Sequence, residues 1–366
     1  MNHMFDLPQE NGLDEDPDPP FLADLPQFPE RLYENGKPNL FNKTGTVCAL
    51  YWLGKQLGLH ESFPLADLIN RLHFHGSKTY YSQKIKRQEK NGRVKNRILF
   101  IPDAELMAVQ RKISSRLFES AALRHENSHG YLGSNCQNAI GTHWQAKSML
   151  IFDVKDAFFK VNRERLFGEL RNRGFGWQVA SFICDLCLYF PVARNSWLRS
   201  KGARREFLPQ GAPTSAKLFD LAFRELDKYY AKFARRHGGT YSRYADNIFI
   251  GLPREEFPER LANAALQEAS RHGFPAHKVR KIRNAEFWRG LGLNMNAGQL
   301  TNSRAFRRAF RGALHHLEYV LDRGLARDGA LQKINGFMSF AVNLPGDLRQ
   351  DYETCLERIR NQSIKI

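Results

Sequence analysis

Hydrophobic and polar positions along the chain follow two periods, and the changes of period predict the order of helices and strands. Helical spacing predicts short helices within residues 45–75 and further helices at 103–123, 163–174 and 177–190. The run "SMLIFDVKDAFFKV" predicts a buried strand that ends on Asp153. From about residue 304 the pattern is helical again, and no internal repeat is present.

A long helix and a hairpin are predicted in the middle of the chain. The segment "LPQGAPTSAKLFDLAFRELDKYYAKFARRHGG" opens as a Gly/Pro loop and continues at helical spacing to Gly238 and Gly239. In "TYSRYADNIFIGL", two runs of strand-favouring residues flank Ala-Asp-Asn, which predicts a tight turn. Asn tolerates a positive φ, which would suit Asn247 to the hairpin tip. The turn is either a surface Asx turn or a means of aiming Asp246 at a metal ion.

The charge distribution favours a polyanionic partner. The 366-residue chain has a formal net charge of +17, and residues 1–30 hold eight acids and no Lys or Arg, so the remainder carries +25. Nucleic acid is the first candidate, and an anionic membrane is the weaker one because no Lys-faced amphipathic anchor is evident. Residues 1–30 are acidic and Pro-rich, and we expect them to be mostly disordered. Without a long apolar run or a signal pattern, we expect a cytoplasmic protein with no membrane partner.

A basic segment, "KTYYSQKIKRQEKNGRVKNRILFIP", predicts a hairpin that turns at "KNGR". Its first strand carries Lys84, Lys86 and Arg87, which we expect to face phosphates, with Tyr80 and Tyr81 adding base stacking. The alternative is an ordinary solvated hairpin. Elsewhere, Cys184 and Cys187 have the spacing of metal or redox pairs, but they lie in an apolar run with no second pair. We interpret them as buried core thiols.

Two carboxylates stand at predicted strand ends. Asp153 follows four apolar residues, and Asp246 lies at the tip of the predicted hairpin. A carboxylate in apolar surroundings has to be paired, hydrated or bound to a metal. Two that converge from neighbouring strands can hold two Mg²⁺ ions, the arrangement that activates a 3′-hydroxyl group and stabilises leaving pyrophosphate.

The order of these motifs resembles that of reverse transcriptases, among them the retron, group II intron and defence-associated enzymes of bacteria. "FDVKDAFF", "LPQGAPTS" and "YADN" resemble their motifs A, B and C, and "FPAHKVRKIRN" is similar to the Lys-bearing motif D. The resemblance covers about residues 75–345. It implies an α+β right-hand polymerase with fingers, palm and helical thumb. The expected division is a tail at 1–30, N-terminal helices and fingers at 31–145, palm at 146–300 and thumb at 301–366.

The resemblance implies a role for each matching position. Asp153 and Asp246 would be the catalytic metal ligands, with Asn247 as a third oxygen ligand for two Mg²⁺ ions, or Mn²⁺ in their place. Phe158 would be the steric gate against a ribose 2′-hydroxyl group, or else a core residue beside Phe159, since only one of two adjacent strand residues can face the core. Gln210 and Gly211 would line the nucleotide site, where Gly lets the backbone approach closely, and Arg97 with Lys95 would pair with the triphosphate.

The chain departs from the family pattern in two places. Asn247 stands where the family usually has a second Asp, so one charge is lost while an amide oxygen is kept. "NAIGTH" has three residues between Ala139 and His143 where retron enzymes have two, and Trp288-Arg289-Gly290 replaces their Val-Thr-Gly. We therefore favour a retron-related, defence-type enzyme over a true retron enzyme.

Four arginines share one face of the predicted thumb helix, at i, i+3, i+4 and i+7: Arg304, Arg307, Arg308 and Arg311. We expect them to contact RNA phosphates, the alternative being a solvated face. The leading hypothesis is a polymerase that copies a structured non-coding RNA into DNA from dNTPs in antiphage defence. The alternatives are template-independent or protein-primed DNA synthesis and a non-catalytic RNA-binding scaffold. A second copy of the chain and an accessory defence protein are further candidate partners.

Overall fold

The computed structural model describes residues 33–34, 37–38, 43–59, 65–75, 79–88, 94–119, 124–131, 134–191, 206–326 and 328–363. The acidic segment 1–30, which was expected to be disordered, lies outside these residues. None of the helices in the described ranges combines the length and the apolarity that crossing a bilayer requires.

A four-stranded antiparallel sheet forms the centre of the fold, in the order β6-β7-β5-β8. Its strands are β5 (Ser148–Val154), β6 (Thr240–Tyr244), β7 (Asn247–Leu252) and β8 (Ala276–Ile282). The predicted buried strand is confirmed, although it ends one residue later, at Val154. The predicted hairpin is confirmed as β6–β7, with Tyr244 paired to Asn247.

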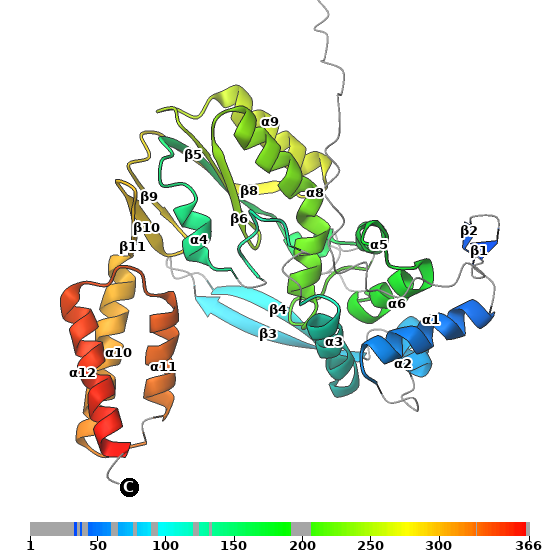
Figure 1. The fold of residues 1–366 in the computed structure, drawn as a ribbon, viewed down its shortest axis with the longest axis horizontal. Helices are drawn as coiled ribbons and strands as arrows, with labels where there is room; N and C mark the ends of the chain where they lie inside the picture. The colour runs from blue at the N-terminus through cyan, green and yellow to red at the C-terminus, as the bar shows by residue number, and fades with distance from the viewer. Residues whose placement is uncertain are drawn as a thin grey trace, which may run out of the picture.

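Both faces of the central sheet are covered, because alternate residues of a strand point to opposite sides. On one face, Leu150, Phe152 and Val154 pack with the long helix α8 (Ser215–Arg236) and with α9 (Glu259–Arg271) (Figure 1). On the other, Met149 and Ile151 pack with α4 (Cys136–Gly141) and a small sheet. That sheet has the order β11-β10-β9, formed by β9 (Phe287–Gly290), β10 (Leu293–Asn296) and β11 (Gln299–Asn302).

A second group of elements lies beside the central sheet (Figure 1). The hairpin of β3 (Tyr80–Gln88) and β4 (Val94–Pro102) is paired as predicted from Tyr80–Pro102 to Gln88–Val94. Near it lie five helices: α1 (Lys43–Gln56), α2 (Leu65–His75), α3 (Ala104–Arg116), α5 (Arg163–Asn172) and α6 (Trp177–Cys187). The short pair β1 (Tyr33–Glu34) and β2 (Lys37–Pro38) lies farther from the hairpin (Figure 1). Cys184 and Cys187 are fully buried in α6, and burial raises the pKa of each thiol to about 12, which confirms core thiols.

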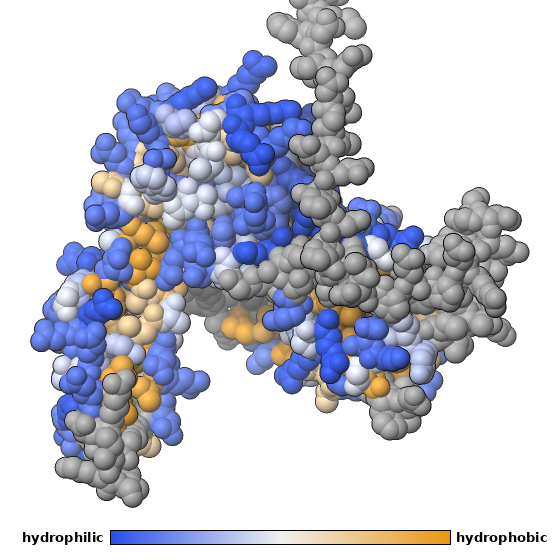
Figure 2. All heavy atoms as spheres, viewed as in Figure 1, coloured by the Kyte–Doolittle hydropathy of each residue, from blue (hydrophilic) through white to orange (hydrophobic). Residues whose placement is uncertain are grey.

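Three C-terminal helices have a hydrophobic core of their own. They are α10 (Arg304–Asp322), α11 (Asp328–Phe340) and α12 (Gly346–Ser363), packed around Phe310, Leu314 and Leu317. Figure 2 shows an apolar area where β11 meets α10. There the buried Asn302 donates to the Phe340 carbonyl (3.1 Å) and accepts from the Val342 amide (2.6 Å). This bond pair ties the end of α11 to the small sheet.

Two local expectations are wrong. Phe158 and Phe159 are not strand residues, because a short 3₁₀ helix, η5 (Ala157–Lys160), follows β5. Tyr80 is buried, and its hydroxyl group accepts a hydrogen bond from Gln110 (2.9 Å), so it cannot stack on a base. Tyr81 is 58% exposed and remains a candidate for stacking.

Candidate active site

The two carboxylates predicted to converge lie at one end of the β5–β7 pair. Asp153 on β5 is in register with Asn247 on β7, and the Val154 amide donates to the Asp246 carbonyl (2.9 Å). Asp246 belongs to the two-residue turn between β6 and β7. The positive φ of that turn falls on Ala245 (+53°) and not on Asn247, which begins β7 in extended conformation. The expectation for Asn247 at the tip is therefore wrong.

Among the described residues, Asp153 pairs with Lys278 through one carboxylate oxygen, and its other oxygen has no hydrogen-bond partner. Lys278 of β8 donates to Asp153 Oδ2 (2.9 Å). The register between β5 and β8 shifts near Asp153, and Lys278 has a φ of +50°. Asp153 Oδ1 is buried without a hydrogen-bond partner among the described residues. A buried carboxylate oxygen that lacks a donor is suited to receive a cation.

Asn247 acts as a donor toward its neighbour. Its Nδ2 donates to Asp246 Oδ1 (3.2 Å) and lies 3.5 Å from the Tyr244 carbonyl. Both contacts are acceptors, so the amide nitrogen has to face them. The Asn247 side chain thereby orients the carboxylate of Asp246.

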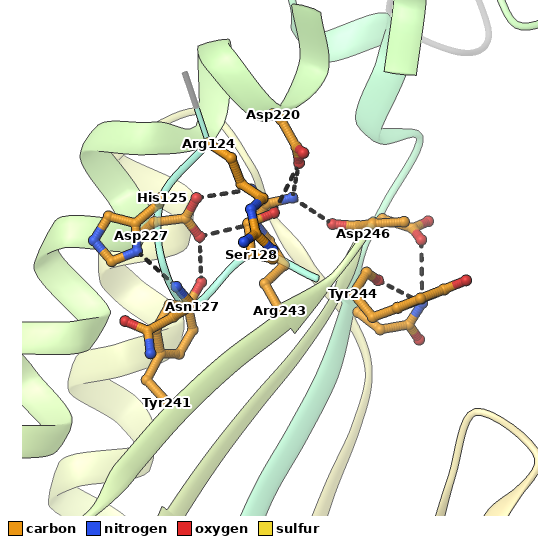
Figure 3. A network of polar contacts seen from close by, with 12 residues as sticks. Arg124, His125, Asn127, Ser128, Asp220, Asp227, Tyr241, Arg243, Tyr244 and Asp246 are labelled. Atoms are coloured by element: carbon orange, nitrogen blue, oxygen red, sulfur yellow. Dashed lines mark hydrogen bonds and ion pairs between the residues drawn. The ribbon is translucent and has the colours of Figure 1, made fainter. Parts of the chain in front are cut away.

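A buried cluster of charged residues lies beside the β6–β7 turn and is hydrogen-bonded to it (Figure 3). Arg243 is 0% exposed and pairs bidentately with Asp227, through Nε to Oδ1 (2.8 Å) and Nη2 to Oδ2 (2.7 Å). Its Nη1 donates to Asp220 Oδ1 (2.8 Å) and to the Ala245 carbonyl (2.9 Å). Burial opposes the charge of Arg243, but the two carboxylates outweigh it and hold its pKa well above the ordinary value. Burial raises the pKa of Asp220 against the pull of Arg243.

The segment 124–131 lies alongside β6 and encloses this cluster (Figure 3). The Arg243 backbone amide donates to the Asn127 backbone carbonyl (2.8 Å), and the His129 backbone amide donates to the Arg243 carbonyl (2.7 Å). Ser128 is fully buried and donates through Oγ to Asp220 Oδ1 (3.0 Å). Gly130 contacts the turn so closely that an added Cβ would collide with the Ala245 amide nitrogen.

The candidate nucleotide-binding residues approach from two sides. Phe158 is half-buried and stacks on Phe219 of α8, with ring centroids 5.2 Å apart, whereas Phe159 is buried. The Gln210 carbonyl accepts from the Phe100 amide of β4 (2.7 Å). Gly211 is exposed at a φ of +111°, a conformation that favours glycine, and an added Cβ would lie 3.2 Å from the Phe100 carbonyl oxygen.

The predicted phosphate-binding residues are only partly described. Lys84 is exposed on β3, while the side chains of Lys86, Arg87, Lys95 and Arg97 lie outside the described residues. On α10, Arg304 and Arg308 are exposed and Arg307 is half-buried. Arg311 is exposed but forms an ion pair with Asp347 of α12 (2.8 Å). The face is therefore less free of acids than the local sequence indicates.

The donor set at the β5–β7 end fits a divalent cation. Asp153 and Asp246 supply carboxylate oxygens, the ligand that Mg²⁺ prefers, and one of them is unpaired and buried. Within the described ranges, no group of three or more His, Cys, Asp and Glu residues gathers in a metal-binding arrangement. Asp153 and Asp246, with the amide oxygen of Asn247, are therefore the candidate ligands.

An antiparallel sheet with two carboxylates at one end, a β3–β4 hairpin beside it and a three-helix bundle beyond it has the α+β architecture of right-hand polymerases, with palm, fingers and thumb. Residues 88–294 match the family of reverse transcriptases (RNA-dependent DNA polymerases), and the chain belongs to that family. The chain resembles the retron enzymes of bacteria within it.

Two curated relatives come from Myxococcus xanthus. Retron Mx65 reverse transcriptase is 30% identical over 225 residues, which cover 60% of this chain and 52% of the relative. Retron Mx162 reverse transcriptase is 30% identical over 220 residues, covering 55% and 44%. The chain thus spans about half the length of these relatives. A solved structure of apo telomerase from Candida tropicalis, truncated from the C-terminal domain, is 10% identical over 67% of this chain and 61% of that one, with a TM-score of 0.39, too low to support an inference.

The sequence pattern does not single out several residues that the fold brings to the site. Asp220 and Asp227 are seven residues apart on α8 and so share a face, but nothing local indicates that this face meets Arg243. Arg243 lies in strand β6, between residues that favour strands. A charged residue within such a run is the one sequence feature that could have suggested a buried ion pair. Lys278 lies in the segment that resembles motif D, but the sequence does not indicate that its ammonium group contacts Asp153.

Proposed function

We propose that the protein is an RNA-directed DNA polymerase that copies a structured non-coding RNA into DNA in the bacterial cytoplasm, as part of antiphage defence. The observation that carries the proposal is the pairing of β5 with the β6–β7 hairpin, which brings Asp153 and Asp246 to one end of the sheet in a chain of the reverse transcriptase family. When bound there, two Mg²⁺ ions, or Mn²⁺ ions, supply activation of the primer 3′-hydroxyl group and neutralisation of the leaving pyrophosphate.

The chain's own residues bind and select the nucleotide. Phe158 is half-buried and lies five residues after Asp153, which supports its role in excluding a 2′-hydroxyl group. Gly211 has no side chain, which lets the motif B loop lie close against β4, and we assign Gln210 and Gly211 of this loop to the nucleotide site. Lys95 and Arg97 lie on β4, the strand that this loop contacts, and we assign them to the triphosphate.

The charge of the chain supports a nucleic-acid partner. Arg304 and Arg308 of α10 are exposed, and the first turn of this helix holds no acid. The formal charge outside residues 1–30 is +25. A surface of this kind binds phosphates without reading bases. The RNA is therefore selected by its shape and single-stranded regions.

Template dependence is tested with purified protein, a defined RNA, a DNA primer and four dNTPs. We expect DNA complementary to the RNA, and a changed RNA sequence should change the product correspondingly. DNA that forms equally well without RNA, or that remains attached to the protein, would establish untemplated or protein-primed synthesis instead. Failure to incorporate any dNTP while RNA is bound would indicate a scaffold.

The biological role is tested in cells. RNA that co-purifies with the protein should be structured and should match the sequenced DNA product. Bacteria that express the protein with its native flanking RNA should resist phage, and Asp153→Asn should abolish this resistance at equal protein level. Equal resistance with the variant would separate any defence role from DNA synthesis.

A further inference from the structure

We propose that Arg243 is a positioning residue for Asp246: it fixes the catalytic turn by donating to the Ala245 carbonyl from a buried anchor on α8. This proposal deepens the proposed function and rests on Asp246 being a metal ligand. Arg243 Nη1 donates to the carbonyl of Ala245, the residue directly before Asp246. It acts on the peptide unit directly before Asp246, which sets where the Asp246 side chain begins.

The guanidinium group of Arg243 has the shape this task requires. Nε and Nη2 form a two-pronged pair with Asp227, which leaves Nη1 to bridge Asp220 and Ala245. A planar guanidinium group supplies these donors in fixed directions, and a lysine ammonium group at the end of a flexible chain does not. Phe223 lies under the group, 4.6 Å from ring centroid to Cζ, and restricts its position further.

The turn needs this support because its backbone is strained. Ala245 has a φ of +53°, a region that residues with a Cβ seldom occupy. Gly130 also lies against the turn, so close that an added Cβ would collide with the Ala245 amide nitrogen. Both Arg243 and the segment 124–131 therefore contact Ala245 and restrict the turn.

Helix α8, which carries Asp220 and Asp227, also contacts the candidate nucleotide-binding residues. Asp220 and Asp227 lie on α8, whose first residue, Ser215, donates to the Pro209 carbonyl (2.6 Å) in the loop that holds Gln210. Phe219, also on α8, contacts both the Phe158 ring and the Arg243 guanidinium group (5.6 Å). Arg243 thus fixes Asp246 relative to α8, the helix that follows the motif B loop and contacts the gate residue Phe158 through Phe219.

The test compares Arg243→Lys with Tyr241→Phe. The Tyr241 hydroxyl group donates to Asp227 Oδ1 (2.5 Å), so Tyr241→Phe weakens the same cluster without touching the turn. With the purified full chain, we expect Arg243→Lys to lower kcat at least tenfold with KM for dNTP within twofold, and to weaken Mn²⁺ binding, measured calorimetrically without nucleotide. Hydrogen exchange in the peptide covering residues 244–249 should accelerate. Tyr241→Phe should lower the melting temperature and leave kcat, Mn²⁺ binding and hydrogen exchange near their wild-type values.

Two further variants distinguish a failure to fold from a loss of function. If Arg243→Lys yields too little folded protein, Arg243→Lys/Asp220→Asn balances one buried cation with one carboxylate, and Asp220→Asn alone is its control. Unchanged exchange and Mn²⁺ binding in folded Arg243→Lys would overturn the proposal, as would equal losses in Tyr241→Phe. An inactive wild-type protein would contradict the proposed function instead, while the exchange experiment would still test whether Arg243 holds the turn.

Discussion

Asp153 and Asn247 face each other in register across the β5–β7 pair, so a carboxylate and a carboxamide begin the site from neighbouring strands. The amide nitrogen of Asn247 donates to Asp246 Oδ1, 3.2 Å away. This hydrogen bond orients the Asp246 carboxylate when no cation is bound. A carboxylate in place of the Asn247 amide could not do so, because two carboxylates at this distance repel each other.

This contact predicts the effect of changing Asn247. Asn247→Asp should fold and should keep or raise activity with Mg²⁺, because a bound cation offsets the added charge. Its melting temperature without divalent cations should be lower than that of wild type. Asn247→Ala should reduce activity, though less than Asp246→Ala does. Primer extension across a Mg²⁺ series measures these effects, and a well-folded but inactive Asn247→Asp would show that the neutral amide is required.

Phe158→Ala should admit ribonucleotides. Removing the ring opens space beside the sugar, and discrimination between dNTP and rNTP should fall by roughly 10- to 200-fold, the range that one contact in a pocket carries. The ratio of kcat/KM for matched dATP and ATP gives the result. Phe159→Leu is the matched control, since Phe159 is buried and packs on Phe207 (4.7 Å). If rNTP use stays as low as in wild type, either another residue is the gate or Phe158 is a core residue.

The arginines of α10 should determine the salt dependence of RNA binding. Replacing Arg304, Arg307 and Arg308 with Gln should reduce the slope of log K against log salt concentration by about 2, since each phosphate contact contributes roughly 0.7 for single strands. Arg311→Gln should change it less, because Asp347 already pairs with Arg311. Filter binding from low to moderate salt supplies the slopes. Equal slopes for the triple variant and wild type would make this an ordinary solvated face.

His143 should make the fold sensitive to acid. Burial, with a smaller contribution from His129, lowers the pKa of His143 to about 3, and its ring nitrogens contact Thr240 Oγ1 (2.7 Å) and Ser242 Oγ (2.8 Å). The unfolded chain binds this proton near pH 6.5, so stability is full above that pH and falls as the pH drops toward 3. From pH 7.5 to 5 the loss is about 2 kcal/mol. Urea unfolding of His143→Gln should show a smaller loss, and an equal loss would place the proton elsewhere.

The convergence of Asp153 and Asp246 was predictable, because a buried strand and a hairpin are local patterns and the motif order indicates how they pair. The long helix α8 and the C-terminal helices were predictable for the same reason, whereas α4 and α9 were not predicted. Contacts between distant segments were not: Arg311 meets Asp347 only because α12 folds back on α10, and Tyr80 is buried only because Gln110 and α6 cover it.

Backbone details at the site also lay beyond local patterns. Residue preference favours a positive φ at Asn247, yet pairing of Tyr244 with Asn247 assigns it to Ala245, and Arg243 and Gly130 hold it there. Phe158 and Phe159 depart from the strand pattern because β5 ends at Val154 and η5 begins three residues later.

The most direct test of the assignment is primer extension on a defined RNA by wild type, Asp153→Asn and Asp246→Asn, with RNA affinity measured in parallel. Metal ligands contribute several kcal/mol to the transition state, and each 1.36 kcal/mol is a tenfold change in rate. We therefore predict losses of roughly 10³-fold or more for both variants, with RNA affinity within about twofold of wild type. Extension by either folded variant at a rate near that of wild type would contradict the assignment of Asp153 and Asp246 as the catalytic pair.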